Sequence, residues 1–242
     1  MRHRLRVLKA KTLAWLGFLG LVVAVARRRV DQVWVGDSNS VLFVRDSFPP
    51  LGVGNDGDRR WVWHLGPRLM FSMARDDFKP GMHRALRILR RVPGSDRVTW
   101  FFSFGEIDVR CHLAPHVKEK PELPFVPTYV ERVRRLAADL GAPRAFVVVP
   151  VPPALDTLID EAFPIKGTPA ERLEAHRLMR ADLLAVTRAN QTGPTIHAVD
   201  LTDLLSDASG HFRPELTYDG VHPTDAGRTL IREGVTRSLQ ST

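Results

Sequence analysis

The sequence predicts an α/β domain in which a parallel sheet is covered by helices on both faces. Short apolar strands alternate with helical stretches from residue 31 to the end of the 242-residue chain, as in sheets whose parallel strands are joined by helical crossovers. The run AFVVVPV at 145–151 is continuous and β-branched, as expected of a strand buried on both faces. A chain of this length suffices for one full-sized core but is short for two domains.

Each element can be placed from its local pattern. The expected strands are Gln32–Val35, Trp61–Leu65, Val98–Phe104, Ala145–Val151 and Thr195–Leu201. The expected helices are Ser40–Val44, Pro67–Ala74, Met82–Arg91, Thr128–Leu140, Pro169–Ala189 and Thr224–Ser238. Thr168 and Pro169 form a typical helix start, and Gly141 ends the preceding helix. The Pro-rich connections 112–128 and 152–168 lack periodicity, and we expect them to form flaps over the carboxyl edge of the sheet.

The basic charge is confined to the N-terminus. The chain has a net charge of +8, and residues 1–30 contain eight Arg and Lys side chains and no acidic one. The body at 31–242 is therefore neutral, which argues against a nucleic-acid partner. Residues 12–26 carry no charge and would form a helix of roughly 22 Å, shorter than the ~30 Å hydrocarbon core of a bilayer.

Three interpretations of residues 1–30 compete. A signal peptide fits the basic start and the small residues 24–26, but three arginines would directly follow the cleavage point. A short membrane anchor fits the flanking basic residues, and a helix packed on the domain or on a partner subunit is the third choice. We place membrane or partner contact through residues 12–26 first, with the protein in the cytoplasm at the inner face of the membrane.

Disulfide and metal chemistry have little support. Cys111 is the single cysteine, so an intrachain disulfide is impossible, and no Cys/His cluster has the spacing of a zinc site. We expect no metal and no resident cofactor.

Two short motifs at opposite ends of the body carry the chemistry. Gly36-Asp37-Ser38-Asn39-Ser40 follows the first strand, and a serine at a strand-to-helix turn can expose its hydroxyl. Asp219 and His222 are three residues apart just before the last helix, where both can address one point. Alone, either motif is more simply a turn or a helix cap. Together they predict a serine with its base and orienting carboxylate.

The two motifs together resemble the SGNH (GDSL-type) hydrolase superfamily, whose last block commonly reads Asp-Gly-x-His-Pro, as residues 219–223 do here. The resemblance covers nearly all of residues 32–240. It implies a three-layer α/β/α sandwich with a five-stranded parallel, flavodoxin-like sheet. It also implies that Ser38 is the nucleophile, His222 the base and Asp219 its orienter. The oxyanion hole would comprise the backbone N–H groups of Ser38 and Gly66, with Gly52 and Gly54 as weaker choices than Gly66.

The third family block, usually Gly-x-Asn-Asp, reads Gly105-Glu106-Ile107-Asp108 here. Ile107 stands where the family has an asparagine that donates to the oxyanion, and losing such a donor costs ~2.7–4 kcal/mol. Arg110 and His112 are the nearest replacements. The charged residues after this strand either form an internal ion pair or recognise a polar substrate. The expected substrate-binding residues are Asp37, Asn39, Glu106, Asp108, Arg110 and His112.

The same triad can pass an acyl group to water or to another hydroxyl. The variant third block and the charged loop favour transfer. The chain also resembles an actinobacterial branch of the superfamily, which implies octanoyl transfer from octanoyl-CoA to a glucosylglycerate-type sugar acceptor. Acyl-CoA is then the expected co-substrate. A carboxylester hydrolase is the alternative, and a catalytically silent, membrane-tethered binding module is the third possibility because of Ile107.

Overall fold

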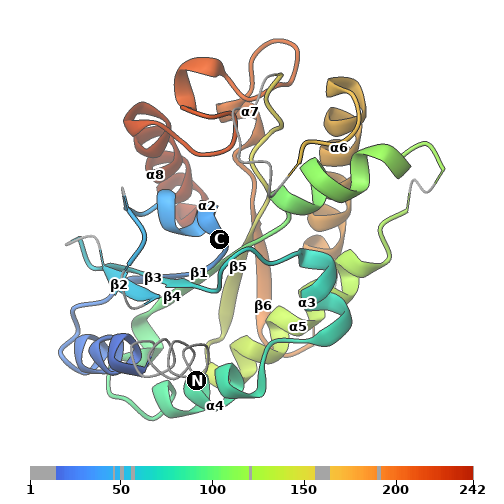
Figure 1. The fold of residues 1–242 in the computed structure, drawn as a ribbon. Helices are drawn as coiled ribbons and strands as arrows, with labels where there is room; N and C mark the ends of the chain where they lie inside the picture. The colour runs from blue at the N-terminus through green and yellow to red at the C-terminus, as the bar shows by residue number, and fades with distance from the viewer. Residues whose placement is uncertain are drawn as a thin grey trace, which may run out of the picture.

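A computed structural model describes residues 15–45, 47–49, 52–55, 58–119, 122–155, 164–189 and 192–241. Figure 1 shows a central twisted sheet with helices on both sides. The strands are β1 (Gln32–Gly36), β2 (Val53–Asn55), β3 (Arg60–His64), β4 (Thr99–Ser103), β5 (Arg144–Val148) and β6 (Thr195–Val199). They lie in the order β2-β3-β1-β4-β5-β6.

The predicted fold class is confirmed, with one change in the strand count. The five expected strands pair in parallel in the order β3-β1-β4-β5-β6, which is the flavodoxin-like arrangement. The sixth strand, β2, is antiparallel to β3 at the edge of the sheet. It escaped prediction because three residues with a central glycine carry no periodic apolar signal.

Helices cover both faces of the sheet. One face packs against residues 15–26, α3 (Met70–Asp76), α4 (Pro80–Leu89), α5 (Phe125–Leu140) and α6 (Pro169–Arg188). The other packs against α2 (Ser38–Leu42), α7 (Thr202–Leu205) and α8 (Asp225–Gln240). Successive residues of β1 divide between the two cores: Val33 and Val35 enter the first and Trp34 the second, as the period of two in a strand requires.

Residues 15–26 form a helix that packs against the first core on one side only. Phe18, Leu21 and Val25 are buried in that core. Trp15, Leu16, Leu19 and Val23 are each about half exposed, so a stripe of large apolar side chains faces away from the body. None of the helices in the described part of the chain is long and apolar enough to cross a membrane. Residues 12–14 of the predicted segment lie outside the described residues, and the expected membrane or partner contact stays a prediction.

The two Pro-rich connections meet beside the carboxyl edge of β4. The first begins in a π-helical turn, η2 (Asp108–Leu113), followed by η3 (Ala114–His116). In the second, residues 156–163 lie outside the described residues, and Lys166 donates its backbone N–H to the carbonyl of Arg110 at 3.0 Å. The shorter elements η1 (Ser95–Arg97) and η4 (Pro214–Leu216) complete the chain.

Candidate active site

The order of the strands places the site. β1 and β4 are neighbours in the sheet, and the chain continues onto one face after β1, in α2, and onto the other after β4, in α5. The two connections diverge at the carboxyl ends of these strands, where a crevice opens in sheets of this kind. Ser38 is the first residue of α2, directly after the carboxyl end of β1. Gly36 permits the tight turn, because a Cβ added there would lie 2.2 Å from the carbonyl oxygen of Ser103 on β4.

Ser38, His222 and Asp219 form a continuous hydrogen-bonded chain. Nε2 of His222 lies 3.0 Å from Oγ of Ser38, and Nδ1 of the same ring lies 2.5 Å from Oδ2 of Asp219. The sequence separation between the serine and the histidine is 184 residues. The geometry is that of a nucleophile, a base within reach of its proton, and a carboxylate that orients the base.

The loop before α8 holds the histidine and the carboxylate in place by its own hydrogen bonds. Oδ1 of Asp219 accepts the backbone N–H groups of Val221 and His222 at 2.9 and 2.7 Å. Partial burial would raise the pKa of Asp219, but the hydrogen bonds from the His222 ring and these N–H groups lower it below its usual value. The carboxylate therefore stays ionised beside the imidazole. Tyr218, which was not predicted, stacks its exposed ring on His222 with centroids 5.8 Å apart.

The two backbone N–H groups expected to bind the oxyanion lie on segments that the structure joins by a hydrogen bond. Ser38 is the first residue of its helix, so its N–H has no intrahelical acceptor. The segment after β3 is tied to β1 because Leu65 donates its N–H to the carbonyl of Gly36 at 2.8 Å. Gly66 follows directly with φ of 76°. Gly54, the weaker choice, lies in the edge strand β2.

Ile107 lines a cavity next to this segment. The cavity has a volume of about 280 Å³, and Pro67, Leu69, Cys111, His112, Pro164 and Lys166 complete its walls. His112 and Lys166 are both exposed, and the pKa of His112 is lowered by partial burial and by the positive charge of Lys166. The cavity thus has mostly apolar walls, with Lys166 as the cation of its lining.

Asp108 lies beneath the site and faces the start of α3. Its side chain is 1% exposed, and its two oxygens accept the backbone N–H groups of Met70 and Phe71 at 2.7 and 3.1 Å. Burial raises the pKa of Asp108 to about 6, although both N–H groups lower it. The carboxyl therefore joins the turn after β4 to the helix after β3.

The other predicted substrate residues after β4 separate into two groups. Arg110 and Glu106 form a buried bidentate pair, with Nε–Oε1 and Nη2–Oε2 distances of 2.6 and 3.1 Å. This pair spans one turn and fixes the loop, which was one of the two interpretations. His112, by contrast, lies at the cavity mouth.

Asp37 and Asn39, on either side of the nucleophile, are also buried. Oδ1 of Asp37 accepts the N–H of Asn39 at 3.0 Å and thereby caps α2. Burial, followed by the negative charge of Glu106, raises the pKa of Asp37 well above its usual value. Among the described residues, its second oxygen has no hydrogen-bond partner.

Sequence reasoning missed Arg172, which organises the second connection. This buried side chain donates to the backbone carbonyls of Gly167, Ala154 and Leu155 at 2.9, 3.4 and 3.1 Å. Its position in the first turn of α6 resembles that of a solvated helix residue, so the pattern gave no signal of its role. The start of α6 was predictable from the sequence, and in the structure Thr168 and Glu171 form a capping box there.

Comparison with known proteins identifies structural relatives only. No protein-family model and no curated protein matches the sequence. A proposed acylhydrolase from Bacteroides fragilis is 18% identical, with 87% of this chain and 86% of that chain covered and a TM-score of 0.55. A carbohydrate esterase of family 3 from Talaromyces cellulolyticus is 14% identical, with coverages of 87% and 96% and a TM-score of 0.53. A GDSL-like lipase from Bacteroides thetaiotaomicron is 14% identical, with coverages of 89% and 90% and a TM-score of 0.52. The chain therefore has the fold of these proteins.

Proposed function

We propose that the chain is a serine acyltransferase that moves a medium-chain acyl group to a sugar hydroxyl through an acyl-Ser38 intermediate. The observation that carries the proposal is the Ser38–His222–Asp219 hydrogen-bond chain at the carboxyl end of β1. A hydroxyl within 3.0 Å of an imidazole that is itself held by an ionised carboxylate is arranged for nucleophilic attack on a carbonyl.

The proposed reaction has two steps, acylation of Ser38 by the donor and transfer of the acyl group to the acceptor. His222 takes the proton of Ser38 as Oγ attacks the acyl carbonyl, and the N–H groups of Ser38 and Gly66 receive the oxyanion. When the tetrahedral intermediate collapses, the bond to the leaving group breaks and His222 protonates that group. The acceptor hydroxyl then gives its proton to His222 and attacks the acyl-serine, and the returning proton restores Ser38.

The cavity beside Ile107 supports an acyl-CoA donor. Its apolar walls suit an alkyl chain, and Lys166 on its exposed side offers positive charge to an anionic carrier such as coenzyme A. His112, whose pKa is lowered, offers a neutral imidazole as a hydrogen-bonding group there. The isoleucine places no polar atom there. We propose octanoyl-CoA as the donor and a glucosylglycerate-type hydroxyl as the acceptor.

A carboxylester hydrolase is the second candidate. The esterase and the lipase named among the structural neighbours favour it, and the partly exposed Ser38 is open to water. The two candidates differ only in the acceptor that attacks the acyl-serine.

One experiment separates these candidates. Octanoyl-CoA consumption is followed by mass spectrometry with and without glucosylglycerate for the wild type, Ser38→Ala and the matched variant Ser95→Ala in the turn η1. An acylated sugar that requires the acceptor and Ser38, and survives in Ser95→Ala, supports the transferase. Free octanoate in equal yield with and without acceptor identifies a hydrolase and refutes transfer.

A second experiment tests the triad without assuming any substrate. A fluorophosphonate probe should label Ser38 in the wild type and fail to label Ser38→Ala or His222→Ala. An unlabelled wild-type protein would contradict both enzyme candidates and support a silent binding module.

A further inference from the structure

A second apolar cavity lies on the other side of the segment that follows β3. It has a volume of about 400 Å³, within the ~300–1,000 Å³ range of small-molecule sites. Its apolar lining comprises Trp63, Leu65, Met73, Phe78 and Met82. Pro67 and Leu69 of the same segment face the cavity beside Ile107 instead, so the segment separates the two cavities.

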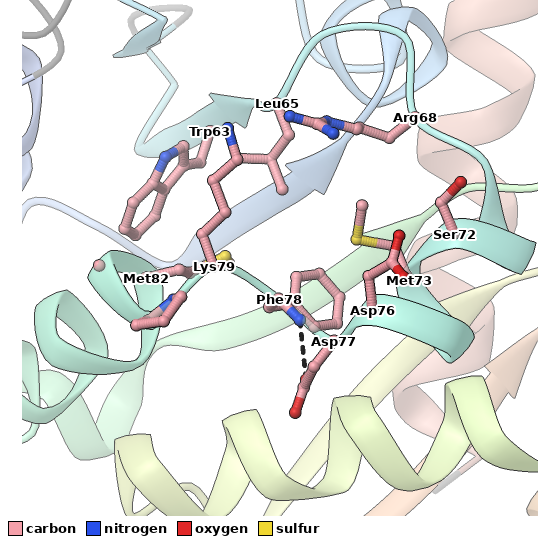
Figure 2. Close-up of a pocket in the computed structure, with 12 residues that line it drawn as sticks. Trp63, Leu65, Arg68, Ser72, Met73, Asp76, Asp77, Phe78, Lys79 and Met82 are labelled. Carbon is pink, nitrogen blue, oxygen red and sulfur yellow. Dashed lines mark hydrogen bonds between the residues drawn. The ribbon is translucent and has the colours of Figure 1, made fainter.

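Two cations converge at one rim of this cavity. Figure 2 shows the side chains of Arg68 and Lys79 reaching toward the same rim beside Leu65. Among the carboxylates that the structure describes, none is within 4.0 Å of either cation. A guanidinium and an ammonium at one point attract a carboxylate or phosphate oxygen.

The two carboxylates of the cavity already have partners. Asp76 pairs with Arg75 at 2.7 Å. Asp77 pairs with Arg132 at 3.0 Å and Arg135 at 3.4 Å. The lining therefore holds two cations and two carboxylates, and both carboxylates are already paired with arginines outside the lining. The charges left to attract a ligand are those of Arg68 and Lys79.

We propose that this cavity binds a single-chain anionic amphiphile of the fatty-acid class, distinct from the substrate of Ser38. The head group would lie between Arg68 and Lys79, where Arg68 can offer two N–H groups to one carboxylate. The alkyl chain would lie against Trp63, Phe78 and the two methionines, whose flexible thioethers adapt to chains of different length. The site is independent of the proposed reaction, because the segment after β3 stands between it and the cavity beside Ile107.

The test is a calorimetric titration of Ser38→Ala protein with decanoate, decyl phosphate, decanol and decyltrimethylammonium. We expect one saturable decanoate site per chain, with decanol and the cation at least tenfold weaker. The affinity for decyl phosphate, compared with that for decanoate, shows whether the site binds negative charge in general or a carboxylate in particular. In Arg68→Gln/Lys79→Gln, decanoate should weaken about tenfold and fall to the affinity of decanol. The matched variant Arg84→Gln/Arg91→Gln, on exposed positions near α4, should bind as the parent does.

Three outcomes would overturn the proposal. These are equal affinity for decanoate and decanol in the parent protein, unchanged decanoate affinity in the double rim variant, or no saturable binding up to the solubility limit of decanoate. A fourth measurement separates the two cavities. Wild-type protein whose Ser38 has been modified by a fluorophosphonate should still bind decanoate, and loss of binding there would assign the ligand to the Ser38 site.

Discussion

The buried carboxyl of Asp108 makes the stability of this protein depend on pH in a direction opposite to that of an ordinary ion-paired carboxylate. Its pKa is raised to about 6 in the folded chain, against 3.8 as the reference value. The folded state therefore binds more protons than the unfolded state between these pH values, so the free energy of unfolding decreases as pH rises through this window. The stabilising contribution is present at low pH and is lost above pH 6.

The size of the effect follows from the same two values. At pH 7 the folded carboxyl is roughly 10% protonated and at pH 5 roughly 90%, whereas the unfolded carboxyl is ionised at both. With 1.36 kcal/mol for each unit of pKa, the wild type gains about 1.3 kcal/mol between pH 7 and pH 5 from this group. Asp108→Asn keeps the shape of the side chain and cannot titrate, so it should lack this gain.

The assay is urea unfolding, followed by tryptophan fluorescence, at pH 5, 6 and 7 for the wild type and Asp108→Asn. Asp37, the other buried carboxyl with a raised pKa, is present in both proteins, so its own titration largely cancels in the difference. Asp96→Asn, on an exposed turn, is the control and should follow the wild type. Parallel curves for the wild type and Asp108→Asn would refute the buried, hydrogen-bonded role of this carboxyl. A raised KM with no change in the pH dependence would instead indicate that Asp108 contacts the substrate.

Three further predictions concern the backbone, the triad and the N-terminal helix. Gly36→Ala should lose about 1–3 kcal/mol of stability and most fluorophosphonate labelling, because the added Cβ would overlap a carbonyl of β4. A Cβ added at Gly81 meets no atom within 4 Å, so the control Gly81→Ala should melt like the wild type. Asp219→Asn should fold normally but react with the probe slower by on the order of 10⁴, because the imidazole loses its orienting acceptor; an unchanged rate would remove the carboxylate from the proposed mechanism. Wild-type protein should sediment with vesicles rich in phosphatidylglycerol and should not sediment with vesicles of pure phosphatidylcholine. Leu16→Ser/Leu19→Ser should reduce the sedimentation with phosphatidylglycerol severalfold. Equal sedimentation of both proteins would exclude the exposed apolar stripe as the membrane contact.

The five parallel strands were predictable because each is a short apolar run. This signal is local and does not depend on which helices pack against the strand. Ser38 and His222 were predictable because their neighbours form compact motifs, which are local in sequence even though the contact between them spans 184 residues. Contacts between distant segments that lie outside such motifs could not be predicted. Asp108 accepts N–H groups from residues nearly forty positions earlier in the chain, and Arg172 binds the carbonyls of a loop that precedes its helix. Neither contact leaves a local pattern.

The charged residues after β4 show why contacts between segments distant in sequence occur at the candidate site. Glu106 and Arg110 neutralise each other, which leaves Asp37 and Asp108 as buried carboxyls whose ionised forms are disfavoured. Because burial disfavours the ionised forms of Asp37 and Asp108, both carboxyls lower the stability of the fold at neutral pH. The carboxyls of Asp37 and Asp108 bind backbone N–H groups at the starts of the helices that follow β1 and β3. Asp37 fixes the turn that carries Ser38, and Asp108 joins the turn after β4 to the helix start that follows Gly66. The cost in stability at neutral pH thus accompanies the fixing of the two turns that carry the proposed nucleophile and the proposed oxyanion donor.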